Sequence, residues 1–362
     1  MGALQDVAAA GQSVWYDNIR RALLDSGQLA SFIDRYAVTG VTSNPTIFEQ
    51  AIAGGGDYDQ AISDALDEGV EDAEEIFWRL AIRDIQDTAD LLAPIHAATD
   101  GRDGFVSLEL PPRLAHDTDG SVAMALELAR RVDRANLMVK VPGTPAGIAA
   151  IEELIARGVH VNVTLLFSLS QWSDTAEAYQ RGLERRREAG QDLRVASVAS
   201  FFVSRIDAAA NPELPEVLHN RLAVANAQLA YTAHLELLAG DRWQQLAAAG
   251  AHPQRLLWAS TSAKDPRLDD GYYVGALVAD GTVNTMPEHT MLAFDRDGSV
   301  TGTLAAASAD AQAIAEAAGE AGVDLEPLGA RLQQQGDASF ATSFDNLLDC
   351  IRTKVASLRA AA

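Results

Sequence analysis

The chain has 362 residues, a length that allows either two domains of average size or one enlarged α/β barrel. Its 48% hydrophobic and 22% charged residues are typical of a soluble globular protein with a sizeable core, and they exclude a largely disordered chain. The 51 acidic residues outnumber the 28 basic ones, and the resulting net charge of -23 argues against a general nucleic-acid-binding or anionic-membrane-binding surface. Only three of the basic residues are lysines, namely Lys140, Lys264 and Lys354.

Short apolar or β-branched runs alternate with longer segments of helical period, which is the pattern of βα units. In chain order, the expected strands are Ser13–Asp17, Val38–Ser43, Phe105–Leu110, Leu137–Val141, Val159–Phe167, Arg194–Val203, Leu256–Ser260 and Thr282–Met286. The clearest helical segments between them are 121–133, 145–158, 170–190 and 215–240. Eight such units predict one closed (β/α)8 TIM barrel.

The length beyond an ordinary barrel falls into three helical regions of a single domain that spans 1–362. They are an acidic insertion at about 54–97, the stretch between the sixth and seventh strands, and a tail at about 304–362. A doubly wound open sheet is the competing architecture, but no G-x-G-x-x-G or P-loop lysine follows a strand. The glycine run 54–56 also lacks the Lys-Ser/Thr pair of a phosphate-binding loop, so we interpret it as a turn between helices.

Lys140 stands out because it interrupts an apolar strand, NLMVKVP at 136–142. The period of two places Lys140 on the face opposite Val139 and Val141, which in a parallel barrel points to the interior. A desolvated lysine with a lowered pKa is the requirement for a Schiff-base nucleophile. The alternative is a lysine at a strand end that reaches solvent or forms a structural ion pair.

Other predicted strands carry polar residues near their carboxyl ends, with the same inward period. They are Asp17, Thr42 with Asn44, Ser107 with Glu109, Asn162 with Thr164, and Ser200. Individually, such residues are more often satisfied structural groups or helix N-caps. Together they surround one barrel mouth, where the catalytic groups of these barrels reside.

Four segments strongly resemble the transaldolase family, in the order in which that family has them. They are GVTSNPTIF at 40–48, VKVPGT at 139–144 followed by Gly147 and Ile148, VNVTLLFS at 161–168 and ASFFVSRID at 199–207. The resemblance extends over roughly positions 13 to 290.

This resemblance implies a cofactor-free and metal-free transfer of a dihydroxyacetone unit within the non-oxidative pentose phosphate pathway. The donor would be sedoheptulose 7-phosphate or fructose 6-phosphate, and the acceptor glyceraldehyde 3-phosphate or erythrose 4-phosphate. Lys140 would form the Schiff base with the ketose C2 carbonyl, and Asp17 would remove and later return the C4 hydroxyl proton. Glu109, with Thr164 through a water, would handle the proton transfers of dehydration and hydrolysis.

The same resemblance implies the substrate contacts. Asn44 and Asn162 would orient the C1 and C3 hydroxyls, Ser200 would line the pocket, and Arg205 would bind the substrate phosphate. Near the seventh strand the sequence departs from the family pattern, in which a serine is followed two positions later by arginine.

That departure affects the second half of the expected phosphate site. The serine is Ser260, and Ser262 occupies the place of the arginine. We therefore expect Ser260 to contact substrate and Lys264 to supply the second cation.

Two other functions remain open at this point. The first is a Schiff-base aldolase that cleaves fructose 6-phosphate and lets the enamine be protonated; the second is a non-catalytic binding barrel, which predicts loss of Lys140, Asp17 or Glu109. A metal-dependent aldolase is disfavoured because the seven histidines form no His-x-His or His-x-x-x-His pair.

The compartment and the partners follow from composition. A lone cysteine, Cys350, excludes an intrachain disulfide or a four-thiolate metal site and indicates a reducing compartment. There is no signal-like N-terminus and no apolar run of about 18 residues. We expect a cytoplasmic protein, a monomer or homodimer, that binds sugar phosphates and neither nucleic acid nor membrane.

Overall fold

The computed structural model describes residues 2–300, 302–304 and 309–361. Within these residues, eight parallel strands close into a barrel in sequence order, and β8 pairs with β1. The strands are β1 (Ser13–Asp17), β2 (Val38–Thr42), β3 (Val106–Glu109), β4 (Leu137–Pro142), β5 (Val161–Leu166), β6 (Ser197–Phe202), β7 (Arg255–Ala259) and β8 (Val283–Met286). The predicted (β/α)8 barrel is confirmed, and each predicted strand matches one of these to within a few residues.

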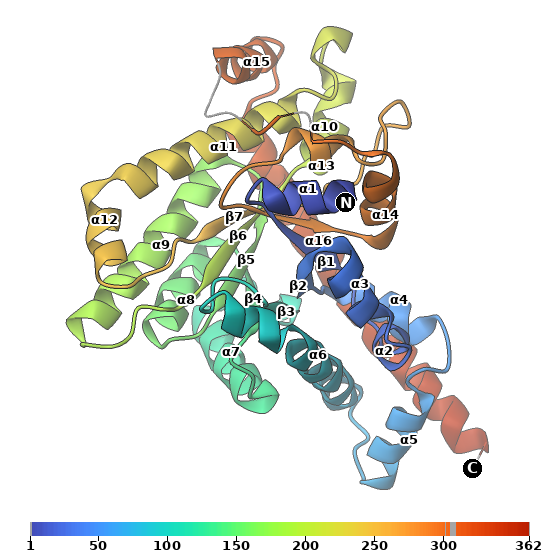
Figure 1. Cartoon of the computed structure of the whole chain (residues 1–362). Helices are drawn as coiled ribbons and strands as arrows, with labels where there is room; N and C mark the ends of the chain where they lie inside the picture. The colour runs from blue at the N-terminus through green and yellow to red at the C-terminus, as the bar shows by residue number, and fades with distance from the viewer. Residues whose placement is uncertain (1, 301, 305–308, 362) are drawn as a thin grey trace.

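Helices surround the barrel on its outer side (Figure 1). In the first half of the chain they are α1 (Ala3–Ala9), α2 (Arg21–Asp25), α3 (Gln28–Tyr36), α4 (Pro45–Ala53), α5 (Asp59–Asp67), α6 (Ala73–Ala98), the 3-10 turn η1 (Pro112–Leu114), α7 (Thr118–Val132) and α8 (Pro145–Ala156). In the second half they are α9 (Leu169–Glu188), α10 (Ser204–Ala210), η2 (Asn211–Glu213), η3 (Glu216–Leu218), α11 (Leu222–Ala239), α12 (Asp241–Ala248), α13 (Tyr272–Ala276), α14 (Glu288–Asp297), α15 (Ala309–Glu320) and α16 (Leu325–Ala361).

Several helices begin directly after a strand because the connecting loop supplies an N-cap. Asn44, Thr144 and Ser168 each accept a hydrogen bond from a backbone N–H of the first turn of α4, α8 and α9. Proline follows Asn44 and Thr144 at the first helical position, where its missing N–H costs no hydrogen bond. These short connections keep the carboxyl ends of β2, β4 and β5 close to the barrel mouth.

The amino end of the barrel is closed by a buried polar cluster. The Trp15 indole N–H donates to Asp103 at 2.8 Å, and Ser13 donates to the same carboxylate at 2.5 Å. Arg255 donates to Ser13 at 2.7 Å and forms an ion pair with Asp103 at 3.4 Å. These groups form hydrogen bonds and ion pairs with one another, so they are not available to a substrate. The candidate site lies at the opposite end of the barrel.

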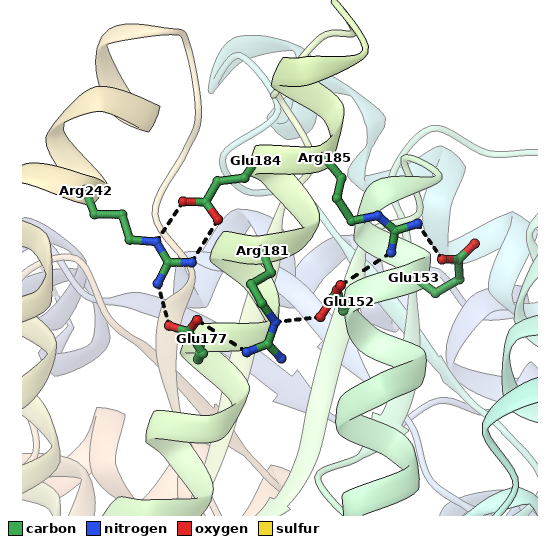
Figure 2. A network of polar contacts seen from close by, with 7 residues as sticks. All are labelled: Glu152, Glu153, Glu177, Arg181, Glu184, Arg185 and Arg242. Carbon is green, nitrogen blue, oxygen red and sulfur yellow. Dashed lines mark hydrogen bonds and ion pairs between the residues drawn. The ribbon is translucent and has the colours of Figure 1, made fainter.

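Outside the barrel, charged side chains connect three neighbouring helices (Figure 2). Arg181 and Arg185 of α9 pair with carboxylates of α8, and Arg242 of α12 pairs with carboxylates of α9. The members are Glu152, Glu153, Glu177, Arg181, Glu184, Arg185 and Arg242. Each pair is partly exposed, so this network fixes the packing of the helices more than it adds stability.

One predicted helix begins later than expected. The segment 215–240 was expected to be helical throughout, but α11 starts at Leu222, after the short turns η2 and η3. Asn220 adopts a left-handed backbone with φ of +59° just before it, and its side-chain amide donates to Asp265 at 2.8 Å. An asparagine in that conformation ends the preceding turn, so the helix can form only beyond it.

The added helical regions have distinct positions. Within 54–97 the structure places α5 and α6, and α6 packs on β2, β3 and α7 as an ordinary barrel helix does. In the tail, α15 packs on α11, whereas α16 lies against α4, α5 and α6 and reaches β5 and α10. Figure 1 shows α16 as a long diagonal helix, in red. Residues 305–308 and 362 of the predicted tail lie outside the described residues.

Candidate active site

Strand register places three of the predicted residues side by side inside the barrel. Glu109 on β3 pairs in register with Lys140 on β4, and Lys140 with Asn162 on β5. All three side chains are buried. Because side chains alternate along a strand, residues in register on neighbouring parallel strands point to the same side of the sheet, here the interior.

The Lys140 amine lies among buried groups. Its Nζ is 3.1 Å from Glu109 Oε2, and the two side chains are only 6% and 7% exposed. The same nitrogen donates to the Ser43 backbone carbonyl at 3.2 Å. The ring of Phe340, from α16, has its centroid 5.8 Å away. Lys140 therefore neither reaches bulk solvent nor lies unpaired.

Two carboxyl groups act on this amine, the buried Glu109 and the partly buried Asp17. Asp17 accepts a hydrogen bond from Thr42 Oγ1 at 2.6 Å, and Thr42 also contacts Thr285 at 2.7 Å. Burial raises the pKa of Asp17 and the pKa of Glu109, and the Lys140 charge opposes both shifts. Carboxyl groups whose pKa is raised in this way can hold and release a proton near neutral pH.

The polar residues of β5 and β6 differ in how their hydrogen bonds are satisfied. The Asn162 amide donates to Ser107 Oγ at 3.0 Å, and its oxygen accepts from Ser200 Oγ at 2.7 Å. In contrast, Thr164 Oγ1 is fully buried and has no hydrogen-bond partner in the described part of the chain. An unsatisfied buried hydroxyl is costly, which suits a group that meets a water or a substrate.

Most of the predicted residues line one cavity of about 280 Å³ at the carboxyl end of the barrel. Its walls include Asp17, Asn44, Lys140, Thr164, Ser200, Arg205, Ser260 and Lys264. Glu109 and Asn162 do not line it; they contact Lys140 and Ser200 from the side. Asn44 has a second role, because its side-chain oxygen accepts from Ile47 N and caps α4.

The rim of this cavity is positively charged. Arg205 is partly buried and Lys264 more exposed, and among the described residues neither has a carboxylate within 4 Å. Desolvation and the nearby Arg205 guanidinium lower the pKa of Lys264. Two neighbouring cations without an ion-pair partner form a site for an anion in a chain that is otherwise strongly acidic.

Sequence reasoning missed several residues of the wall. Thr46, Thr285 and His289 lie on it, and so does Phe340 of α16, two hundred positions after Lys140. Thr285 follows the inward period of β8 and could have been found from that pattern. Phe340 has no such signal, because no motif relates α16 to the strands.

The described residues contain further features that bear on function. A larger cavity of about 520 Å³, also lined by residues of α16, is lined by none of the ten predicted residues. No cluster of three or more His, Cys, Asp or Glu in the described part of the chain is arranged to hold a metal ion. Across residues 2–300, 302–304 and 309–361, we find no helix with the length and apolar character that a membrane span requires.

Comparisons with known proteins converge on one family. The family model described as "Transaldolase/Fructose-6-phosphate aldolase" matches residues 14–351. A transaldolase of Saccharopolyspora erythraea is 45% identical over 359 residues, covering 97% of both chains. A transaldolase of Thermobifida fusca is 45% identical over 98% of both chains, and one of Acidothermus cellulolyticus is 46% identical over 95% of this chain and 94% of its own.

Proposed function

Because the chain belongs to the transaldolase/fructose-6-phosphate aldolase family and is a transferase of the transaldolase type, we propose that it carries a dihydroxyacetone unit on Lys140. The donor is sedoheptulose 7-phosphate or fructose 6-phosphate, and the acceptor is glyceraldehyde 3-phosphate or erythrose 4-phosphate. These are reactions of the non-oxidative pentose phosphate pathway in the cytoplasm. The observation that carries the proposal is the buried Lys140 amine 3.1 Å from the buried Glu109 carboxylate.

Formation of the Schiff base needs a neutral amine. Burial raises the pKa of Glu109, which makes its carboxylate a better acceptor for the ammonium proton of Lys140. The free amine attacks the ketose C2 carbonyl to give a carbinolamine. Glu109, with Thr164 through a water, delivers the proton that lets hydroxide leave as water, and the iminium forms. The unpartnered Thr164 hydroxyl supports this role.

Asp17 governs carbon–carbon bond cleavage. It removes the proton from the C4 hydroxyl, the C3–C4 bond breaks, and the bonding electrons move into the iminium to give an enamine on Lys140. The first aldose then leaves. The enamine carbon attacks the aldehyde of the second aldose, and Asp17 returns its proton to the new hydroxyl. Burial raises the pKa of Asp17, so this carboxyl can carry the proton between the two half-reactions.

The remaining residues hold the substrate. Arg205 and Lys264 bind its phosphate, because both lie at the cavity rim and neither forms an ion pair with a described carboxylate. Ser260 and Ser200 line the path between phosphate and amine. The amide nitrogen of Asn44 and the Asn162–Ser200 pair orient the C1 and C3 hydroxyls.

Borohydride trapping tests the nucleophile. Reduction in the presence of fructose 6-phosphate, followed by peptide mass mapping, should place a reduced three-carbon adduct on the peptide that contains Lys140. The Lys140→Met variant should give none, whereas Lys354→Met, the matched control, should be labelled as the wild type is. The chain has only one further lysine, Lys264, so the assignment is unambiguous. No adduct, or an adduct on either other lysine, would overturn the mechanism.

A second measurement separates transfer from simple aldol cleavage. The rate of glyceraldehyde 3-phosphate release from fructose 6-phosphate is compared with and without erythrose 4-phosphate. A transferase needs the acceptor to clear the enamine, so the acceptor should raise the rate strongly. Equal rates would favour the fructose 6-phosphate aldolase activity instead.

A further inference from the structure

The side chain of Gln333 joins α16 to the two strands that carry Lys140 and Thr164. Its amide nitrogen donates both protons to main-chain carbonyls, one to Gly143 at 2.9 Å and one to Leu165 at 3.0 Å. Gly143 directly follows β4, and Leu165 lies near the end of β5. The Gly143 N–H donates in turn to the Thr164 carbonyl at 2.8 Å. One glutamine thus completes a hydrogen-bonded junction between the two strands.

The backbone at this junction is strained. Leu165 adopts a left-handed conformation with φ of +61°, which a residue with a side chain rarely adopts. The pairing of β5 with β6 shifts register between Val163 and Leu166, so the β6 ladder does not hold the intervening residues. A conformation of this kind persists only where its surroundings impose it, and it is often found at functional sites.

Helix α16 lies close enough to impose this conformation. A Cβ atom at Gly336 would lie 2.7 Å from Leu165 Cδ2, so the helix approaches this side chain closely at a position that has no side chain of its own. Gln333 lies on the preceding turn of the same helix. The Leu165 side chain is therefore packed beneath Gly336 while its carbonyl is held by Gln333.

This strained residue directly follows Thr164, whose hydroxyl lines the cavity without a partner. If Leu165 relaxed to a negative φ, the peptide joining it to Thr164 would rotate. That rotation would move the Thr164 hydroxyl relative to the Lys140 amine. The Gln333 hydrogen bond to the Leu165 carbonyl, which is made from outside the barrel, opposes this rotation.

We propose that Gln333 is a positioning residue for proton transfer at Lys140: by holding the Leu165 and Gly143 carbonyls, it keeps the Thr164 hydroxyl directed into the cavity. This inference rests on the proposed function, since it assigns Gln333 to the step in which Thr164 and Glu109 move protons. The proposal gives α16 two roles at the site. Phe340 lines the cavity, and Gln333 positions the Thr164 hydroxyl.

Kinetics of Gln333→Met test this role, because methionine keeps the length of the side chain and removes both donors. We expect kcat and the rate of borohydride-trapped adduct formation to fall about tenfold, with KM for fructose 6-phosphate unchanged. The matched control is Lys354→Met, which removes a different anchor of α16, to Gly55 and Asp59. It should lower the midpoint of thermal unfolding and leave kcat unchanged.

A double-mutant cycle separates positioning from mere stabilisation. If Gln333 acts through Thr164, the Gln333→Met change should cost nothing further in a Thr164→Val background. An unchanged kcat in Gln333→Met, or the same fall in the Thr164→Val background, would overturn the role of Gln333 and leave the proposed function intact. A wild-type enzyme that forms no adduct at Lys140 would instead overturn the proposed function, and this role with it.

Discussion

Replacing Lys140 by methionine should make the stability of the fold depend on pH, as well as abolish turnover. The Lys140 ammonium is the cation that faces the buried Glu109 carboxylate at 3.1 Å, and its charge also acts on Asp17. Methionine fills a similar volume without charge. Glu109 then stays buried and Asp17 partly buried, and both have lost the charge of Lys140, so the pKa of each rises further above its ordinary value.

The size of this effect follows from burial. Removing one partner of a buried ion pair costs about 3–5 kcal/mol when the other stays charged. Glu109 can avoid that cost by binding a proton, because its folded-state pKa lies above the ordinary 4.5. The pKa of Glu109 in the unfolded chain is the ordinary 4.5. Because its pKa is higher in the folded state, proton binding by Glu109 stabilises the fold fully below pH 4.5. The stabilisation is lost by about 1.4 kcal/mol per pH unit as pH rises toward the folded pKa.

Urea unfolding followed by circular dichroism between pH 5 and pH 8 measures this. The free energy of unfolding of Lys140→Met should approach that of the wild type at the acidic end and fall below it as pH rises. The control is Lys140→Met combined with Glu109→Gln. The second change removes the carboxylate charge that has lost its partner, so it should recover most of the free energy of unfolding that Lys140→Met loses at pH 8. If the single variant parallels the wild type at every pH, the buried pair does not act as described.

Three further changes have distinct expected results. Thr164→Val should lower kcat about a hundredfold and leave the urea midpoint unchanged, since the hydroxyl has no partner to lose; a large loss of stability would contradict this. Arg205→Gln should lower kcat/KM for fructose 6-phosphate about thirtyfold but leave kcat/KM for unphosphorylated fructose unchanged. The control is Arg267→Gln, which replaces an exposed arginine paired with Asp265 and should change neither value. Asp84→Asn should lower the free energy of unfolding by about 3 kcal/mol in thermal denaturation, because Arg21 loses its buried counter-charge at 2.7 Å; an unshifted midpoint would refute that reasoning.

The barrel and much of its mouth could be predicted because parallel strands impose a strict pattern on the sequence. In β4 and β5 the residues facing the helices are β-branched or apolar, so each inward polar residue stands out against them. Lys140, Asn162 and Thr164 were found in this way. Their hydrogen-bond partners could not be predicted, because the same period describes Asn162, whose amide nitrogen and oxygen each have a partner, and Thr164, whose hydroxyl has none among the described residues.

The contribution of the C-terminal helix could not be predicted, for a different reason. An amphipathic helix shows in its sequence that one face is apolar, but not which surface that face covers. The contact between Phe340 and Lys140 joins segments two hundred positions apart, and it depends on how α16 is anchored by Gln333 and by the Thr46–Ser343 hydrogen bond at 2.8 Å. The three residues that α16 contributes, Gln333, Phe340 and Ser343, belong to no strand-end motif.

Two residues show where local preference and the overall fold disagree. Leu165 near the end of β5 and Ser260 after β7 both have a positive φ, +61° and +56°, although neither is glycine. Each is held from outside, Leu165 by Gln333 and Ser260 by the Ser204 N–H, which donates to its carbonyl at 3.0 Å. Glycine would adopt this backbone more easily, but it would lose more conformational entropy on folding. Leu165 directly follows Thr164, and Ser260 lines the same cavity as Arg205 and Lys264. The strained backbone is therefore found beside the groups that are left available for a substrate.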